Sequence, residues 1–212
     1  MQATRIIAIR HGETAWNVVT RLQGHLDIAL NEVGLWQAGR VAQALADESI
    51  DTIYTSDLQR ARQTAQAIAE VAGCPVIADA GLRERGFGQF EGQTHAEIES
   101  AWPEMSLQWR RRDPLWAPPG GESLTTMRER VLGTASALAA RHIGGQIVLV
   151  AHGGVMDILY RLATGQELQA PRSWNLTNAA INRLLWTPEG FTVVGWADTG
   201  HLENSSLDEA IT

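Results

Sequence analysis

Lysine is missing from this chain altogether, so all 17 of its basic residues are arginine. Without lysine there is no Walker A lysine, no Schiff base and no lysine general base. The cations that remain besides histidine are planar, permanently charged guanidinium groups, which suit bidentate binding of phosphate or carboxylate. Genomic base composition would explain the same depletion, so it assigns no function by itself.

Cysteine and long apolar runs are also scarce. Cys74 is the single cysteine, which excludes an intrachain disulfide, and its place before Pro75 favours a structural role over a nucleophilic one. The apolar run at residues 6–9 is too short for a signal segment or a membrane span, and we expect a cytoplasmic protein. A formal charge of −7 without a dominant basic stretch argues against a nucleic-acid or membrane partner.

The order of apolar patterns predicts an α/β fold. A chain of 212 residues with 44% apolar and 19% charged residues fits one soluble domain, residues 1–212. Strands are expected at about 4–9, 51–55, 76–78, 147–151, 178–186 and 191–196, and helices at about 32–47, 56–72, 124–138 and 155–163. Alternating strands and helices predict a three-layer α/β/α sandwich with a mostly parallel sheet.

Helix caps, a loop, a lid and a tail complete this prediction. Asn31 is the expected cap of the first helix, and Ser56 or Asp57 that of the second, while residues 15–30 are expected to form a loop. The glycine-rich and tryptophan-containing stretch at about 81–119 interrupts the alternation, as a lid over the sheet edge would. The polar tail from residue 204 is expected to be loose.

Two apolar strands end in histidine. The first ends in Arg10-His11-Gly12, and the second ends in His152 followed by two glycines. Because the carboxyl ends of parallel strands share one edge of a sheet, both histidines could reach one site. Transfer of a phosphoryl group through a histidine needs cations around its oxygens and a carboxyl group for the leaving oxygen. Arg60 and Glu84 follow two other predicted strands and could meet these needs.

A backbone anion site could complete the pocket, because the helix that follows His152 has free N–H groups in its first turn. These residues belong to a longer ordered set. The set comprises Arg10-His11-Gly12-Glu13-Thr14 with Asn17, Leu30-Asn31-Glu32-Val33-Gly34 with Gln37-Ala38, the run 56–65, Glu84 with Gly88 and Glu91-Gly92, Gly120-Gly121-Glu122-Ser123, and His152-Gly153. From residue 4 to about residue 202 the chain resembles the histidine phosphatase superfamily, which has the phosphoglycerate-mutase-like fold.

The resemblance implies a role for each matching residue. His11 would be the nucleophile that becomes phosphohistidine, with Arg10, Arg60 and His152 binding the phosphoryl group. Glu84 would act as general acid and then as general base. The substrate side would be lined by Asn17, Gln23, Gly24 and Gly153. No metal is implied, and the partner would be a small phosphorylated metabolite; homodimers are common in the family.

The branch of the family is harder to assign. The mutases carry a Glu-Arg-His-Tyr-type loop and use a lysine, whereas this chain has Glu84-Arg85-Gly86-Phe87 and no lysine. The resemblance therefore favours a small-molecule phosphomonoesterase, with 2,3-bisphosphoglycerate-dependent phosphoglycerate mutase as the alternative; only the mutase would need 2,3-bisphosphoglycerate as a cofactor. A metal hydrolase using His11, His152 and Glu84 as ligands is disfavoured because neighbouring arginines would repel a cation. A catalytically silent phosphoryl-binding module is disfavoured because every expected position is filled.

Some conspicuous residues have no expected catalytic role. We interpret His25, His95, His142 and His201 as structural or solvated. The run Arg110-Arg111-Arg112 is expected to be a solvated run, although one of these arginines could bind a substrate carboxylate. The aromatic residues of the lid are expected to pack within it, or to form an apolar mouth for the leaving group; they are Phe87, Phe90, Trp102, Trp109 and Trp116.

Overall fold

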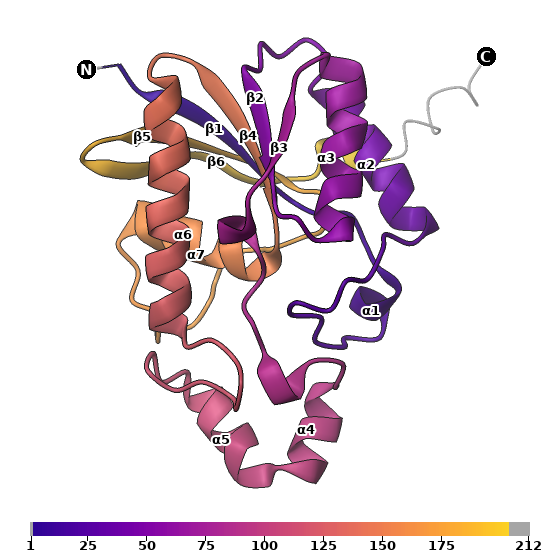
Figure 1. The fold of residues 1–212 in the computed structure, drawn as a ribbon, viewed down its shortest axis with the longest axis vertical. Coiled ribbons are helices and arrows are strands. Elements are labelled where there is room, and N and C mark those ends of the chain that lie inside the picture. The colour runs from indigo at the N-terminus through magenta and orange to yellow at the C-terminus, as the bar shows by residue number, and fades with distance from the viewer. Residues whose placement is uncertain (1, 204–212) are drawn as a thin grey trace, which may run out of the picture.

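A computed structural model describes residues 2–203, which form a six-stranded sheet (Figure 1). The strands are β1 (Thr4–Arg10), β2 (Thr52–Thr55), β3 (Val76–Ala78), β4 (Gln146–Ala151), β5 (Ile181–Thr187) and β6 (Gly190–Asp198). Their order across the sheet is β3-β2-β4-β1-β5-β6. The first four strands of this order are parallel to one another. β5 pairs antiparallel with β1, and β6 pairs antiparallel with β5. The mostly parallel sheet is thus confirmed.

Helices cover both faces of the sheet. On one face lie α2 (Glu32–Ala44) and α3 (Gln59–Ala72), and on the other α6 (Leu124–Ala139) and α7 (Gly153–Thr164). Because successive strand residues point to opposite faces, Ile7 and Ile9 pack with α2 and α3, while Ile6 and Ala8 pack with α6 and α7. β1 and β4 are therefore buried on both sides, which explains their continuous apolar runs. The predicted three layers are confirmed.

The segment between β3 and α6 departs from these layers. It carries α4 (His95–Ala101) and α5 (Pro103–Arg111), which lie away from the sheet at the lower end of Figure 1. Phe90 is fully buried at its centre, with ring centroids 5.9 Å from Trp102 and 5.6 Å from Trp109. The aromatic residues of the lid mainly form its own small core, and only Phe87 and Trp109 among them line the cavity described below.

The predicted helix caps are partly correct. The Gly34 N–H donates to Asn31 Oδ1 at 2.8 Å, so Asn31 caps α2, although this helix ends at Ala44 and not near residue 47. The cap predicted for α3 is wrong. Leu58 occupies the N-cap position without a side-chain bond, and Asp27 Oδ1, 32 residues earlier, accepts from the Gln59 N–H at 2.6 Å. Gly73, at φ 65°, ends α3.

Residues 15–30 are not wholly a loop, because α1 (Ala15–Val18) begins there with a capping box between Thr14 and Asn17. α7 begins at Gly153, two residues before its predicted start. The prediction of a loose tail from residue 204 lies outside the described residues. Among residues 2–203, no helix is long and apolar enough to cross a membrane.

Candidate active site

The register of the two central strands places the two histidines side by side. Arg10 pairs with Ala151 in the parallel ladder, and the next N–H, that of His11, donates to the Ala151 carbonyl at 2.9 Å. His11 and His152 therefore leave adjacent strand ends, and their ring centroids are 5.1 Å apart. Both side chains are buried. Backbone pairing, more than side-chain packing, sets this geometry.

His11 is held in one tautomer. Its Nδ1 lies 2.7 Å from the Gly12 carbonyl oxygen, and since a carbonyl only accepts, Nδ1 carries the proton. The lone pair is then on Nε2. Burial lowers the pKa of His11 well below its ordinary value, and the charges of Arg60 and Arg10 lower it further. The imidazole is accordingly neutral, as a nucleophile must be.

His152 presents the opposite tautomer. The Arg60 Nε–H donates to His152 Nδ1 at 3.3 Å, which puts the imidazole proton on Nε2. That Nε2 atom is buried and has no hydrogen-bond partner among residues 2–203. Burial, followed by the charge of Arg60, lowers the pKa of His152 well below its ordinary value. His152 thus offers an unpaired N–H donor beside the lone pair of His11.

Arg60 lies in the first turn of α3 and is fixed by backbone carbonyls. Its two terminal nitrogens donate to the carbonyl oxygens of Leu26 and Gly24, each at 2.9 Å. Gly24 therefore supports Arg60 through its carbonyl. Gly24 has φ 51°, so a residue with a Cβ would be strained there, and its Cβ would displace the Glu91 carboxylate, 2.1 Å away.

Arg10 and Glu84 meet at the start of α7. Both carboxylate oxygens of Glu84 lie 3.1 Å from the Gly154 nitrogen, and the Arg85 N–H donates to Oε1 at 2.7 Å. The N–H of Gly154 is therefore taken by Glu84 and is not free for a ligand, contrary to the expectation of open donors there. Arg10 donates to the Leu176 carbonyl through one terminal nitrogen, while its buried Nε has no partner within residues 2–203.

A cavity of about 620 Å³ opens next to these groups. Of the predicted residues, Arg10, Asn17, Glu84 and Gly153 line it. His11, Arg60 and His152 are buried and do not line the cavity. His11 directly follows the lining residue Arg10, His152 directly precedes the lining residue Gly153, and Arg60 contacts His152. Gln23 and Gly24 do not line the cavity, and the buried Gln23 has an unpaired Oε1 within the described chain.

Several residues that support the site escaped sequence reasoning. Asn178, in the loop before β5, donates through Nδ2 to the His11 carbonyl at 2.9 Å and lies 3.3 Å from Asn17 Oδ1. Arg85 is buried, stacks over Trp109 at 4.8 Å and has its pKa lowered by burial to about 10. Asn178 belongs to none of the motifs of the sequence, and Arg85, although it is adjacent to Glu84, has no role in the sequence pattern that would indicate its contact with Trp109.

The other four histidines have separate surroundings. His142 lies 2.9 Å from the Tyr54 hydroxyl, and His201 lies 3.0 Å from the Ala179 carbonyl, as structural side chains do. His25 contacts the Glu84 carbonyl at 2.9 Å, and His95 lines the edge of the cavity. Within residues 2–203 no group of three or more His, Cys, Asp and Glu side chains is arranged to hold a metal ion.

Residues 6–199 match the family model of the histidine phosphatase superfamily (branch 1). The chain belongs to this superfamily. The chain is 37% identical over 206 residues to phosphoglycerate mutase-like protein 4 of Arabidopsis thaliana, covering 95% of this chain and 88% of that one. It is 35% identical to the metal-independent phosphoserine phosphatase of the same plant, covering 96% of this chain and 85% of that one.

Solved structures give the same family. A mycobacterial glucosyl-3-phosphoglycerate phosphatase superposes with a TM-score of 0.81 at 34% identity, covering 92% of this chain and 99% of that chain. The relatives thus share the fold along nearly their whole length but carry names for different leaving groups. The family is therefore established, whereas the names of the relatives do not identify the substrate of this chain.

Proposed function

We propose that this protein is a metal-independent phosphomonoesterase for small molecules that works through a phosphohistidine on His11. The observation that carries the proposal is the tautomer of His11, whose Nδ1–H is bound to the Gly12 carbonyl while Nε2 keeps its lone pair. Three unpaired or permanently charged donors surround this imidazole, namely Arg10 Nε, His152 Nε2 and the guanidinium of Arg60. Relatives named as phosphatases support the same activity.

In the first step, His11 Nε2 attacks the phosphorus atom, and the bond from phosphorus to the leaving oxygen breaks. Glu84, protonated at this stage, gives its proton to that oxygen, so the product leaves as a neutral alcohol. The donors of Arg10, Arg60 and His152 stabilise the charge on the three equatorial oxygens. These groups would supply the charge stabilisation that magnesium provides in other phosphoryl-transfer enzymes.

In the second step, water attacks the phosphorus of the phosphohistidine. Glu84, now a carboxylate, takes the proton from that water, and the P–N bond breaks. Phosphate leaves and His11 returns to its starting tautomer. Glu84 lies on the cavity wall, with its carboxylate oxygen 3.1 Å from the Gly154 nitrogen, and this position supports its proposed role at the leaving group.

Phosphoglycerate mutase is the alternative, because some relatives carry mutase names. A mutase must retain a bisphosphate and exclude water from phosphohistidine, whereas a phosphatase must admit water. Only the mutase would require 2,3-bisphosphoglycerate. For the phosphatase we propose no metal or organic cofactor, a small phosphorylated metabolite as partner, and a cytoplasmic location.

The test is turnover of p-nitrophenyl phosphate, O-phosphoserine and 3-phosphoglycerate in a chelator, with and without 2,3-bisphosphoglycerate. We expect phosphate release that persists in the chelator and disappears in His11→Ala. His142→Ala, at the opposite end of the sheet, serves as the matched histidine control and should keep its activity. Bisphosphate-dependent exchange of phosphoglycerates with little free phosphate would replace the phosphatase by the mutase.

A further inference from the structure

The loop that carries Glu84 lies against α6. Gly81, three residues before Glu84, packs so closely on this helix that a Cβ on the glycine would stand 2.1 Å from Thr134 Oγ1. Residues 83–87 belong to no helix or strand, so their backbone carbonyl groups have no partners in a regular hydrogen-bond ladder. Such carbonyl groups are normally satisfied by side chains or by water. The side chains of α6 are the nearest protein donors on this side of the loop.

Arg130 of α6 binds three carbonyl groups of the loop. One terminal nitrogen donates to the carbonyl oxygens of Gly81 and Arg83, each at 2.9 Å. The other donates to Glu122 Oε2 at 2.7 Å and to the Glu84 carbonyl at 3.4 Å, and the Nε–H donates to Glu122 Oε1 at 2.9 Å. All five N–H groups of the guanidinium are thus used. Arg130 also does not line the cavity, so it has no donor to offer a phosphoryl group.

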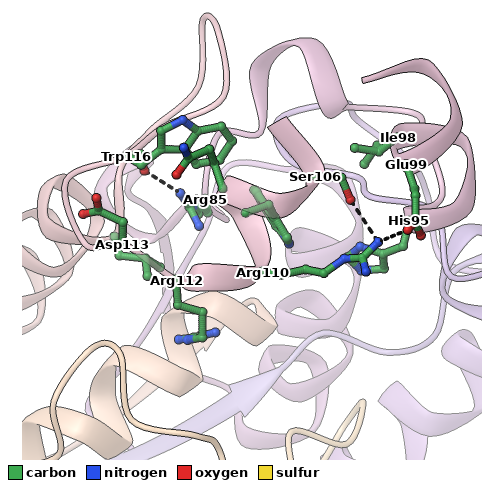
Figure 2. Close-up of a pocket in the computed structure, with 12 residues that line it drawn as sticks. Arg85, His95, Ile98, Glu99, Ser106, Arg110, Arg112, Asp113 and Trp116 are labelled. Atoms are coloured by element: carbon green, nitrogen blue, oxygen red, sulfur yellow. Dashed lines mark hydrogen bonds and ion pairs between the residues drawn. The ribbon is translucent and has the colours of Figure 1, made fainter. Parts of the chain in front are cut away.

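Glu122 brings the returning end of the lid to the same point. Its N–H donates to the Gly86 carbonyl at 2.8 Å, and its carbonyl accepts from the Arg85 Nε–H at 2.7 Å. A terminal nitrogen of Arg85 reaches the Trp116 carbonyl at 3.4 Å, and Figure 2 draws this bond as a dashed line. The side chains of Arg130 and Glu122 are 23% and 14% exposed, so water and salt screen their ion pair only weakly. A mostly buried ion pair thus joins the two ends of the lid.

The carboxyl group of Glu84 depends on where its own backbone lies. It accepts from the Gly154 N–H at 3.1 Å and from the Arg85 N–H at 2.7 Å. The first donor belongs to α7, which packs on the sheet, and the second belongs to the loop itself. A general acid must lie within about 2.6–3.2 Å of the oxygen that it protonates. A shift of the loop relative to α7 would therefore take the carboxyl group out of reach of the leaving oxygen.

We infer that Arg130 is a positioning residue for the general acid. It binds the carbonyl groups of Arg83 and Glu84 and so fixes the backbone from which the carboxyl group reaches the leaving oxygen. Arg130 acts only through Glu84 and touches no substrate. This inference rests on the proposed phosphatase function, in which Glu84 protonates the leaving group. Arg130 stands in none of the motifs of the sequence, and its role follows from contacts with residues far from it in the chain.

The same loop has a second ion pair, between Arg83 and Asp57. Two guanidinium nitrogens of Arg83 lie 2.7 and 2.6 Å from the two carboxylate oxygens. These side chains are 38% and 30% exposed, and ion pairs at such positions contribute little to holding a structure. This pair also binds no backbone group of the loop, whereas Arg130 binds three. We therefore assign the positioning to Arg130, and Arg83→Gln tests the competing assignment.

The test compares phenyl phosphate with p-nitrophenyl phosphate. The two esters are similar in shape, but only the phenolate of phenyl phosphate needs a proton in order to leave. Because kcat/KM includes only the steps up to departure of the leaving group, it reports the proton transfer without the water step. In Arg130→Gln we expect kcat/KM to fall about tenfold or more for phenyl phosphate and less than about twofold for p-nitrophenyl phosphate. Arg128→Gln, exposed on the same helix, should change neither value.

A double variant separates positioning from a general structural effect. Glu84→Gln with Arg130→Gln should be no slower on phenyl phosphate than Glu84→Gln alone, because positioning has no value once the acid is gone. Losses that multiply would mean that Arg130 acts on another part of the protein, and they would overturn the inference. If Arg130→Gln does not fold, Arg130→Lys takes its place in both comparisons. Lysine keeps the charge but presents three donors on one nitrogen, so it should show a smaller loss confined to phenyl phosphate.

Failure of the inference is distinguishable from failure of the proposed function. If Glu84→Gln loses phenyl phosphate selectively but Arg130→Gln slows both esters equally, or neither, the inference is wrong and the phosphatase mechanism stands. A selective loss in Arg83→Gln without one in Arg130→Gln would overturn it in favour of the ion pair with Asp57. If His11→Ala retains turnover of p-nitrophenyl phosphate, the phosphohistidine mechanism itself is wrong.

Discussion

Gly34 lies so close to Glu13 that a Cβ on the glycine would stand 2.0 Å from the Glu13 carbonyl oxygen. The approach is mutual, because a Cβ on Gly12 would stand 2.4 Å from the Gly34 carbonyl oxygen. The loop that follows β1 is thus pressed directly onto the first turn of α2. Since the Gly12 carbonyl holds the tautomer of His11, the contact between Gly12 and Gly34 helps to fix the orientation of the His11 imidazole.

Gly34→Ala should therefore damage both stability and activity. We expect a loss of about 2 kcal/mol or more in the free energy of unfolding, because the backbone must move apart. The matched control is Gly39→Ala in the same helix, where a Cβ meets nothing within 4 Å. This control should stabilise the protein by roughly 0.5–1 kcal/mol. The free energy of unfolding in denaturant and kcat should be measured for both variants. Equal values of both quantities for the two variants would contradict the prediction.

Glu84→Gln should separate the two halves of the reaction. With an alkyl phosphate, the first step loses its proton donor, and kcat should fall by about 10²–10⁴. With p-nitrophenyl phosphate the leaving group needs no proton, so the first step survives and the water step becomes slow. Stopped-flow absorbance should then show a burst of p-nitrophenolate equal in amount to the enzyme present. Glu129→Gln, exposed on α6, should behave as the unmodified protein, and a burst-free Glu84 variant would argue against the assigned role.

Asp27→Ala should weaken α3 and misplace Arg60, because Asp27 Oδ1 caps the Gln59 N–H at 2.6 Å. Removal of a helix cap costs about 0.5–2 kcal/mol. We expect a matching drop in unfolding free energy and a raised KM for every phosphate ester, since Arg60 binds the group they share. The exposed Asp47→Ala has no such contact to lose. An Asp27 variant with unchanged KM would show that Arg60 is held by its carbonyl contacts alone.

Stability should fall as the pH falls below about 6.5. The pKa values of His11 and His152 are lowered well below their ordinary value of 6.5, mainly by burial. Between the folded and unfolded pKa values only the unfolded chain takes up these protons, so acid favours unfolding. Each imidazole contributes up to about 1.4 kcal/mol per pH unit. His11→Asn should remove one of these contributions, as measured by denaturant unfolding from pH 7 to pH 5.

Local signals made much of this fold predictable. The isoleucine-rich run before Arg10 reads as a strand because β1 is buried on both faces, and Asn31 reads as a cap because its side chain bonds its own helix. The strand-end histidines could be brought together from sequence because β1 and β4 are parallel neighbours with registered ends. Each of these inferences needs only the residues of one element or of one sheet edge.

The predictions that failed concern contacts between residues that are far apart in the sequence. The cap of α3 is supplied by Asp27, 32 residues before Gln59, so no inspection of residues 56–58 could reveal it. Asn178 lies 167 residues after His11 in the chain and donates to the His11 carbonyl, so no local pattern predicts this contact. Of the N–H groups expected to be free in the first turn of α7, that of Gly154 is bonded to Glu84, which lies 70 residues earlier in the chain.

The two imidazoles owe their spacing to the ladder between β1 and β4, whereas the walls around the leaving group come from the lid and from the loop before β5. Substitutions in the lid or in the loop before β5 should accordingly leave the positions of His11 and His152 unchanged. A lineage could exchange one phosphate ester for another through a few surface changes while its chemistry stays intact. This separation of the histidines from the walls is consistent with relatives of nearly equal length that are named for different phosphate esters.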